Sequence, residues 1–128
     1  AVGPTETRRP TPSFKRHVMI TITAVIRALP GRADALRDAL CAVAQHVARF
    51  EQDTVGFYIS QDLADRQVFT TYERFASEAA KDAHNGSDAV ARFFAMADTL
   101  IDGPVILQTC TEISCKPLDA AQAPLALD

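Results

Sequence analysis

The sequence of 128 residues predicts a single α+β domain built from one antiparallel sheet and a layer of helices. Three observations predict this fold class. The length is that of one ordinary domain, which can bury roughly two-thirds of the surface of its unfolded chain. Hydrophobic residues make up 48% of the chain and charged residues 23%, a balance that excludes a disordered protein. Segments with strand and helix periodicity follow one another in the order β-α-β-β-α-β.

Residues 17–29 predict the first strand, because β-branched residues are frequent and apolar residues alternate with polar ones. Four apolar side chains share one face of this strand: Ile20, Ile22, Ala24 and Ile26. Pro30-Gly31 then marks a turn.

The following segment predicts an amphipathic helix. Its apolar residues recur at steps of four and three and form one stripe: Leu36, Leu40, Val43, Val47 and Phe50. Asp34 near the start is favourable for the helix dipole. Cys41, next to the stripe, is expected to be a small buried hydrophobic residue.

Residues 55–62 and 67–75 predict two strands joined as a hairpin. Ser77 is expected to cap a short helix, and Asp88 a second helical segment. The apolar face of that segment comprises six residues: Val90, Phe93, Phe94, Ala97, Leu100 and Ile101. Residues 105–113 predict the last strand.

This order is that of the ferredoxin-like split βαβ arrangement, in which helices cover only one face of a four-stranded antiparallel sheet. The opposite face carries several apolar side chains: Val25, Tyr58, Val68 and Tyr72. Because an exposed apolar face favours a partner, we expect a homodimer that packs sheet to sheet as a dimeric α/β barrel. The alternative is that these residues lie on a solvated face.

The two ends of the chain differ in composition from the middle. Residues 1–16 are rich in Pro, Thr and Arg and predict a flexible N-terminal arm, residues 17–115 form the folded domain, and residues 116–128 predict a C-terminal tail. The formal net charge is −3, with basic residues in excess in the arm and acidic residues in excess beyond it. An acidic body disfavours binding to a phosphate backbone, so no nucleic acid is expected as a partner.

Composition also indicates whether to expect contact with a membrane, a reducing compartment or a bound metal. No apolar run approaches the roughly 20 residues that span a bilayer, and the first residues lack the apolar stretch of a secretory signal, so no membrane partner is expected. Three cysteines are few and odd in number, which favours a reducing compartment and a cytoplasmic location. No Cys/His pair has zinc-ligand spacing, so no metal site is expected.

Several segments, in this order, resemble the antibiotic biosynthesis monooxygenase (ABM) domain: IRALPGRADALRDAL, VGFYISQD, FTTYERFASEAAKDAH and DGPV. The specific signals are Pro30-Gly31, Gly56, Glu73-Arg74-Phe75, Ala80 and His84. The resemblance covers residues 18–113 and implies a dimeric α+β barrel. The family's activities include cofactor-free oxygenation of quinols and anthrones, haem degradation and the processing of small signalling molecules.

The resemblance implies a ligand pocket between the sheet and the helices. The alternation of side chains along the strands, together with the match to the family, predicts these substrate-binding residues: Ile22, Ala24, Phe57, Ile59, Thr71, Glu73, Phe75, Lys81 and Phe94. A lining of this kind suits a small, flat, hydrophobic or aromatic ligand. The alternative is that the same residues simply fill a core.

Departures from the family pattern narrow the reaction. Where haem-degrading members carry a haem-ligating His and a strand Asn, this chain has Phe94 and Ala24, and Phe cannot ligate iron. The functional Asn, Trp and Tyr of the anthrone oxygenases correspond to Thr71, Phe75 and Lys81. The resemblance therefore disfavours haem degradation and the anthrone reaction itself.

His84 matches a histidine that is common in quinol-oxygenase-like members, and is the predicted catalytic base. A histidine can accept a proton from an acidic phenol near neutral pH, and the resulting electron-rich anion can itself reduce O2, so no cofactor is expected. Glu73 would orient His84 or pair with Arg74 or Arg27. Two alternatives stay open: isomerisation or cleavage of a small oxygenated metabolite by the same base, and a dimeric binding protein in which His84 is structural.

Overall fold

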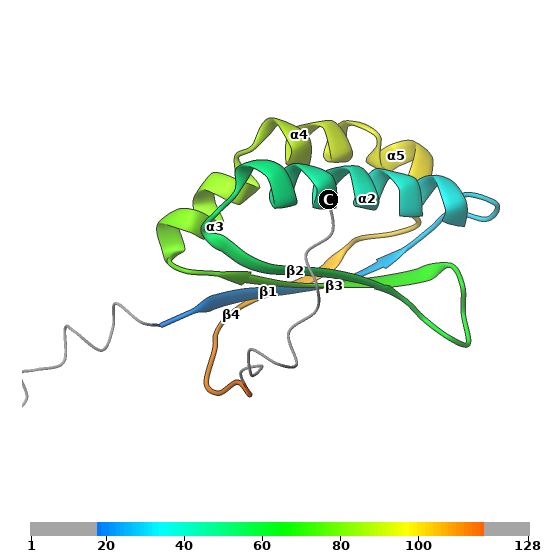
Figure 1. Ribbon diagram of the computed structural model, residues 1–128. Coiled ribbons are helices and arrows are strands. Elements are labelled where there is room, and N and C mark those ends of the chain that lie inside the picture. The colour runs from blue at the N-terminus through cyan, green and yellow to red at the C-terminus, as the bar shows by residue number, and fades with distance from the viewer. Residues whose placement is uncertain (1–17, 117–128) are drawn as a thin grey trace, which may run out of the picture.

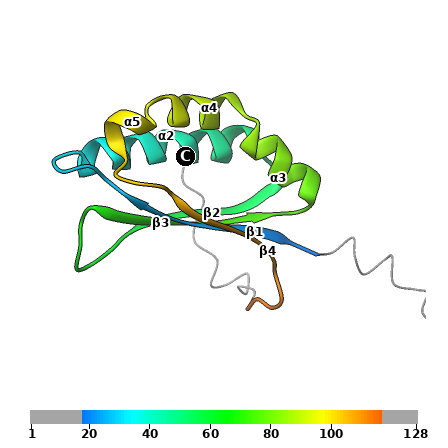
Figure 2. The same cartoon turned by 180° about the vertical axis from the view of Figure 1, so that it is seen from behind.

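Four strands form one antiparallel sheet, and all the helices lie on one side of it (Figures 1 and 2). The computed structural model describes residues 18–116; the predicted arm and most of the predicted tail lie outside them. The elements follow in this order: β1 (Ile20–Arg27), α2 (Ala33–Phe50), β2 (Thr54–Gln61), β3 (Val68–Phe75), α3 (Glu78–Asn85), α4 (Asp88–Ala95), α5 (Ala97–Leu100) and β4 (Ile106–Thr111). The predicted ferredoxin-like order is confirmed.

The strands are arranged in the order β2-β3-β1-β4, and the sheet is open rather than closed. β3 and β1 are therefore the interior strands, and β2 and β4 are the edges. The register pairs Glu73 with Ile22 on one side and with Phe57 on the other. Because side chains alternate across a sheet, these three point toward the helices, as does Thr71 two residues before Glu73.

α2 packs on this face through the stripe that its sequence predicts. Leu36, Leu40, Val43 and Val47 are buried, as are Ile26 and Phe69 of the sheet beneath. The buried stripe ends at Val47. Phe50, predicted to belong to it, is the last residue of the helix and is 70% exposed. The prediction that Cys41 is buried is also wrong: it is exposed, since each helical residue is turned about 100° from the one before it.

Serine side chains begin the two helices that follow the hairpin. Ser77 accepts a hydrogen bond from the backbone N of Ala80 at 3.0 Å, which confirms the predicted cap of α3. The cap of α4 is Ser87, which accepts from the backbone N of Val90 at 3.2 Å, rather than the predicted Asp88. Asp88 is instead the first residue of the helix, where its negative charge is favourable for the helix dipole.

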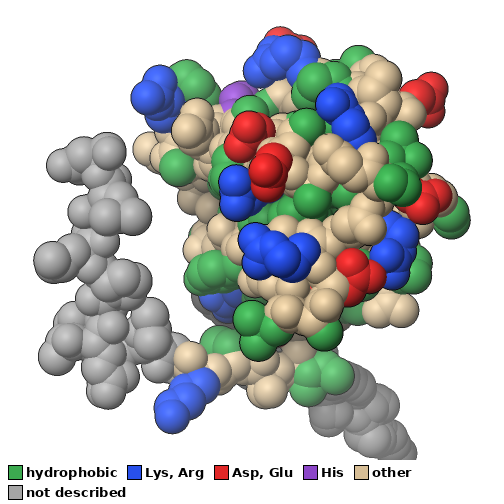
Figure 3. All heavy atoms as spheres, turned by 90° about the vertical axis from the view of Figure 1, so that its right-hand side faces the viewer, with side chains coloured by type: hydrophobic (Ala, Val, Ile, Leu, Met, Phe, Trp, Pro, Cys, Tyr) green, Lys and Arg blue, Asp and Glu red, His purple; other side chains and the backbone are tan. Residues whose placement is uncertain are grey.

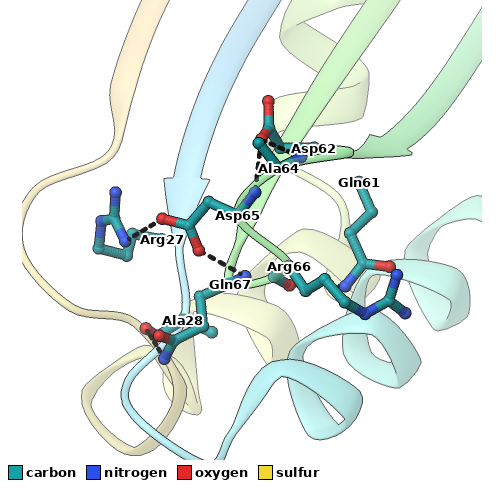
Figure 4. Close-up of polar contacts among 8 residues, drawn as sticks. All are labelled: Arg27, Ala28, Gln61, Asp62, Ala64, Asp65, Arg66 and Gln67. Atoms are coloured by element: carbon teal, nitrogen blue, oxygen red, sulfur yellow. Dashed lines mark hydrogen bonds and ion pairs between the residues drawn. The ribbon is translucent and has the colours of Figure 1, made fainter.

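The turn of the hairpin is held by carboxylates (Figure 4). Asp62 accepts from the backbone N of Asp65 at 2.7 Å, and Asp65 accepts from Arg27 Nη1 at 2.8 Å. The backbone hydrogen bond from Gln67, followed by the one from Arg27, lowers the pKa of Asp65.

Figure 3 views the end of the molecule drawn at the right of Figure 1, where positive and negative side chains are interspersed.

The face of the sheet that no helix covers carries the predicted apolar side chains. Tyr58 is 57% exposed, Val25 40% and Tyr72 39%, and Ile106 of β4 adds to this face. The Tyr58 and Tyr72 rings stack with centroids 6.3 Å apart. Among residues 18–116, no helix combines the length and apolar character needed to cross a bilayer.

Candidate functional site

A cavity of about 70 Å³ lies between the sheet and the helices. Most of its lining is apolar, and the polar groups that reach it come from Thr71, Glu73, His84 and Asn85. The predicted site residues that it brings together are Ile22, Ala24, Phe57, Thr71, Glu73, His84 and Phe94. The arrangement is that of a small apolar site with a few convergent polar groups.

Three predicted site residues do not line this cavity. Ile59 packs against the hydrophobic core. Phe75 is fully buried and contacts the His84 ring, with centroids 5.3 Å apart. Lys81 is paired with Asp82 at 3.0 Å and Glu78 at 3.7 Å on its own helix. Their roles in substrate binding stay predictions.

The volume of the cavity limits what it can hold. An apolar cavity of roughly 150 Å³ can bind benzene, so about 70 Å³ is too small for an aromatic ring without some movement of the lining. Phe94 of α4 and Leu107 of β4 both border the cavity, and each is 52% exposed. Exposed side chains have fewer neighbours to hold them, so these two are the residues best placed to move aside.

His84 lies in the last turn of α3 with only 4% of its surface exposed. Its Nδ1 is 2.8 Å from Glu51 Oε1, and its Nε2 is 3.4 Å from Glu73 Oε1. The rings of Phe57 and Phe75 pack against it at centroid distances of 5.6 and 5.3 Å. The imidazole is therefore fixed between two carboxyl groups inside an apolar shell.

Glu73 is buried on the interior strand β3, where Thr71 Oγ1 donates a hydrogen bond to its Oε2 at 2.8 Å. Burial raises the pKa of this carboxyl group above its ordinary value, because a charge is costly away from water; the Thr71 hydrogen bond and the nearby His84 oppose the rise. Glu73 thus places a carboxyl group of raised pKa next to His84.

The alternative in which Glu73 pairs with an arginine is wrong. Arg74 follows Glu73 on the strand, so it points to the opposite face, where its Nη2 is 2.8 Å from Glu112. Arg27 pairs with Asp65 at the hairpin turn. Of the roles expected for Glu73, the structure supports the one beside His84.

Sequence reasoning missed Glu51, which directly follows α2. Its Oε1 accepts from Thr54 Oγ1 at 2.7 Å and lies against His84, while its Oε2 is 3.2 Å from His46 Nε2. A residue in a turn has no periodicity that assigns it to a face, and Glu51 is 33 positions from His84. The local Glu51–Thr54 spacing was the only signal, and it indicates a turn contact rather than a site.

Metal ligation has no support in the part of the chain that the structure describes, where no group of His, Cys, Asp and Glu side chains could hold a metal ion. The three cysteines, Cys41, Cys110 and Cys115, are free and exposed.

A family model described as antibiotic biosynthesis monooxygenase matches residues 19–96, a range that contains every predicted site residue. Among solved structures, PA3566 from Pseudomonas aeruginosa is 26% identical with a TM-score of 0.69, over 76% of this chain and 96% of that one. NE2512 from Nitrosomonas europaea, a protein of unknown function, is 24% identical with a TM-score of 0.71, over 82% and 99%. A Caulobacter crescentus protein, provisionally assigned as an antibiotic biosynthesis monooxygenase, is 18% identical with a TM-score of 0.71, over 80% and 96%. No curated protein matches the chain.

Proposed function

Because the chain belongs to the antibiotic biosynthesis monooxygenase family, we propose that it oxygenates an electron-rich aromatic compound of the quinol type without a bound cofactor. The observation that carries this proposal is the buried His84, held at the wall of an apolar cavity between Glu73 and Glu51. A histidine with a carboxylate on Nδ1 and its Nε2 toward the ligand has the arrangement of a general base.

The first step is removal of a proton from a substrate hydroxyl. Nε2 of His84 accepts it, with Glu73 alongside, while the hydrogen on Nδ1 is directed at Glu51. The negative charge of Glu51 offsets the positive charge that forms on the imidazole. The apolar lining holds the aromatic ring and keeps water from the anion.

The substrate anion then supplies the electrons that O2 needs. A ring carbon forms a bond to one oxygen atom and loses its hydrogen, and the second oxygen atom leaves as water. A quinol and O2 thus give a hydroxyquinone and water, with the quinol oxidised and O2 reduced.

The small cavity favours compact substrates. About 70 Å³ accommodates a single ring only after Phe94 and Leu107 move, and a three-ring anthrone needs a much larger rearrangement. We therefore propose single-ring quinols as the preferred class. The free cysteines support a reducing, cytoplasmic setting for the reaction.

Oxygen uptake by the purified protein tests this function, with a panel of single-ring quinols and anthrones and with EDTA present to remove stray metal. We expect uptake above the rate of autoxidation, fastest with the smaller quinols, and a loss of roughly a hundredfold or more in His84→Gln. The variant Gln45→Ala, changed at an exposed position of α2, should keep the activity of the parent protein.

Uptake that persists in a folded His84→Gln variant would show that this histidine is not the base. Absence of uptake with every compound would contradict the oxygenase function and favour the isomerase or binding alternatives.

A further inference from the structure

His84 can be approached from two sides. One side is the apolar cavity, and the other is an open groove of about 770 Å³ between the end of α2 and α3. The groove is lined by His84 itself and by polar side chains that include His46, Arg49, Glu51, Asp53 and Ser87. A single imidazole therefore separates an apolar compartment from one that is open to water.

A chain of four side chains crosses this boundary. It begins at Glu73 in the cavity, 3.4 Å from His84 Nε2, and continues from His84 Nδ1 to Glu51 Oε1 at 2.8 Å. Glu51 Oε2 then faces His46 Nε2 at 3.2 Å. The chain ends at His46, whose side chain is 24% exposed.

Glu51 lies at the centre of this series of side chains, between His84 and His46. Its side chain is 13% exposed, and Oε1 is held by both Thr54 and His84. Oε2 is buried and makes no hydrogen bond of ordinary geometry within the described residues, which leaves it directed at the His46 ring. The rings of Phe57 and Phe75, which carry no charge, also pack against the His84 ring. The remaining charged groups of the groove are Arg49 and Asp53.

We propose that Glu51 and His46 carry the proton from His84 into the groove, so that the substrate enters on one side of the imidazole and its proton leaves on the other. This inference rests on the proposed role of His84 as a base. A substrate that fills the cavity blocks that side with apolar surface, and a proton cannot leave through it without water. The groove remains open to solvent while the cavity is occupied.

The proton moves along these side chains in successive transfers. As Nε2 takes the substrate proton, the hydrogen on Nδ1 passes to Glu51 Oε1. The carboxyl group turns and gives this proton to Nε2 of His46, which releases one to groove water, so Glu51 is ionised again and His84 holds its hydrogen on Nε2. When Nε2 gives that hydrogen to the oxygen atom that leaves as water, a proton returns from the groove through His46 and Glu51 to Nδ1, which restores the starting state. Glu51 and His46 do not line the cavity, and both are positioning residues that act through His84.

Exchange of the His84 Nδ1 hydrogen with water tests the path in the protein without any ligand. Its proton NMR signal is identified by its absence from His84→Gln. We expect His46→Gln to slow the exchange roughly tenfold or more, because glutamine has no basic nitrogen that can pass the proton to groove water. The control Asp53→Asn alters the same groove but none of the four side chains of the proton path, and it should leave the exchange rate unchanged. Should exchange in the parent protein be too fast for a signal, the signal should appear in His46→Gln.

An exchange rate in His46→Gln equal to that of the parent protein, or no signal in either, overturns the proton path. Glu51→Gln should slow exchange as well, and Thr54→Val, which keeps the Glu51 carboxylate, should do so less. None of these measurements needs turnover, so failure of oxygen uptake would count against the proposed function alone. Where uptake is found, His46→Gln should lower kcat with little change in KM, and added imidazole should restore it.

Discussion

Glu73 is a carboxyl group placed among apolar side chains, and its raised pKa has a consequence for stability. The folded protein binds the Glu73 proton more tightly than the unfolded chain does. The stability that this neutral form contributes is complete below the unfolded pKa and is lost as the pH rises through the folded pKa. Glu73→Gln cannot ionise and keeps an oxygen for the Thr71 hydroxyl. We therefore expect its free energy of unfolding, relative to the parent protein, to be more favourable at about pH 8 than at about pH 4.

Urea denaturation of both proteins at the two pH values measures this difference. Glu78→Gln serves as the control, because the Glu78 side chain is 75% exposed and should show no comparable trend. The raised pKa would be contradicted if the stability of Glu73→Gln, relative to the parent protein, were lower at the higher pH than at the lower pH.

Individual site residues differ in how well the sequence predicts them. Thr71 and Glu73 follow from alternation along a strand, which fixes the face that a side chain occupies. Ile59 lies on the same face of β2 as Phe57, yet only Phe57 reaches the cavity, because alternation does not say where the helices leave space. Glu51 lies outside any repeating pattern, so only the folded chain brings it to His84.

Helix α4 places Phe93 and Phe94 at the cavity, and its start depends on Ser87. Ser87→Ala removes the acceptor for the backbone N of Val90 and should lower the free energy of unfolding by about 1 kcal/mol. Asp88→Asn removes only a favourable charge in the first turn and should cost less, about 0.3–1 kcal/mol. Urea denaturation gives both values, with Ser114→Ala at an exposed position as the control. A larger loss in Asp88→Asn would reverse the assignment of the cap.

The elements themselves were predicted closely. The hairpin strands, expected at 55–62 and 67–75, lie at Thr54–Gln61 and Val68–Phe75. The sequence predicts the cap of α4 at Asp88, one residue after the observed cap Ser87, because Ser and Asp are both good capping residues. The sequence predicts that the apolar face of the last helical segment reaches Ile101. In the structure Ile101 forms an isolated bridge with Ala28 instead. An apolar residue suits either position, so its type does not distinguish a helix from a bridge.

The helices leave one face of the sheet without cover, and we propose that a second copy of the chain covers it. Tyr58 is the most exposed aromatic side chain of this face. Tyr58→Glu should raise the dissociation constant of the dimer by at least about tenfold, because a two-fold interface receives the new charge twice. Leu63→Glu, at a fully exposed hairpin position, should leave association unchanged. Analytical ultracentrifugation measures both, and a parent protein that is monomeric at all concentrations would contradict the dimer.

The order of the strands also separates the parts of the site by how firmly they are held. Thr71 and Glu73 lie on β3, which is bonded to a strand on each side, whereas Leu107 lies on the edge strand β4, all of whose residues are exposed. Local opening of a protein begins at such margins, and interior strands are the last to lose their protection. The border of the cavity formed by β4 can therefore loosen for a ligand to pass while the buried carboxyl group and its hydroxyl partner keep their positions.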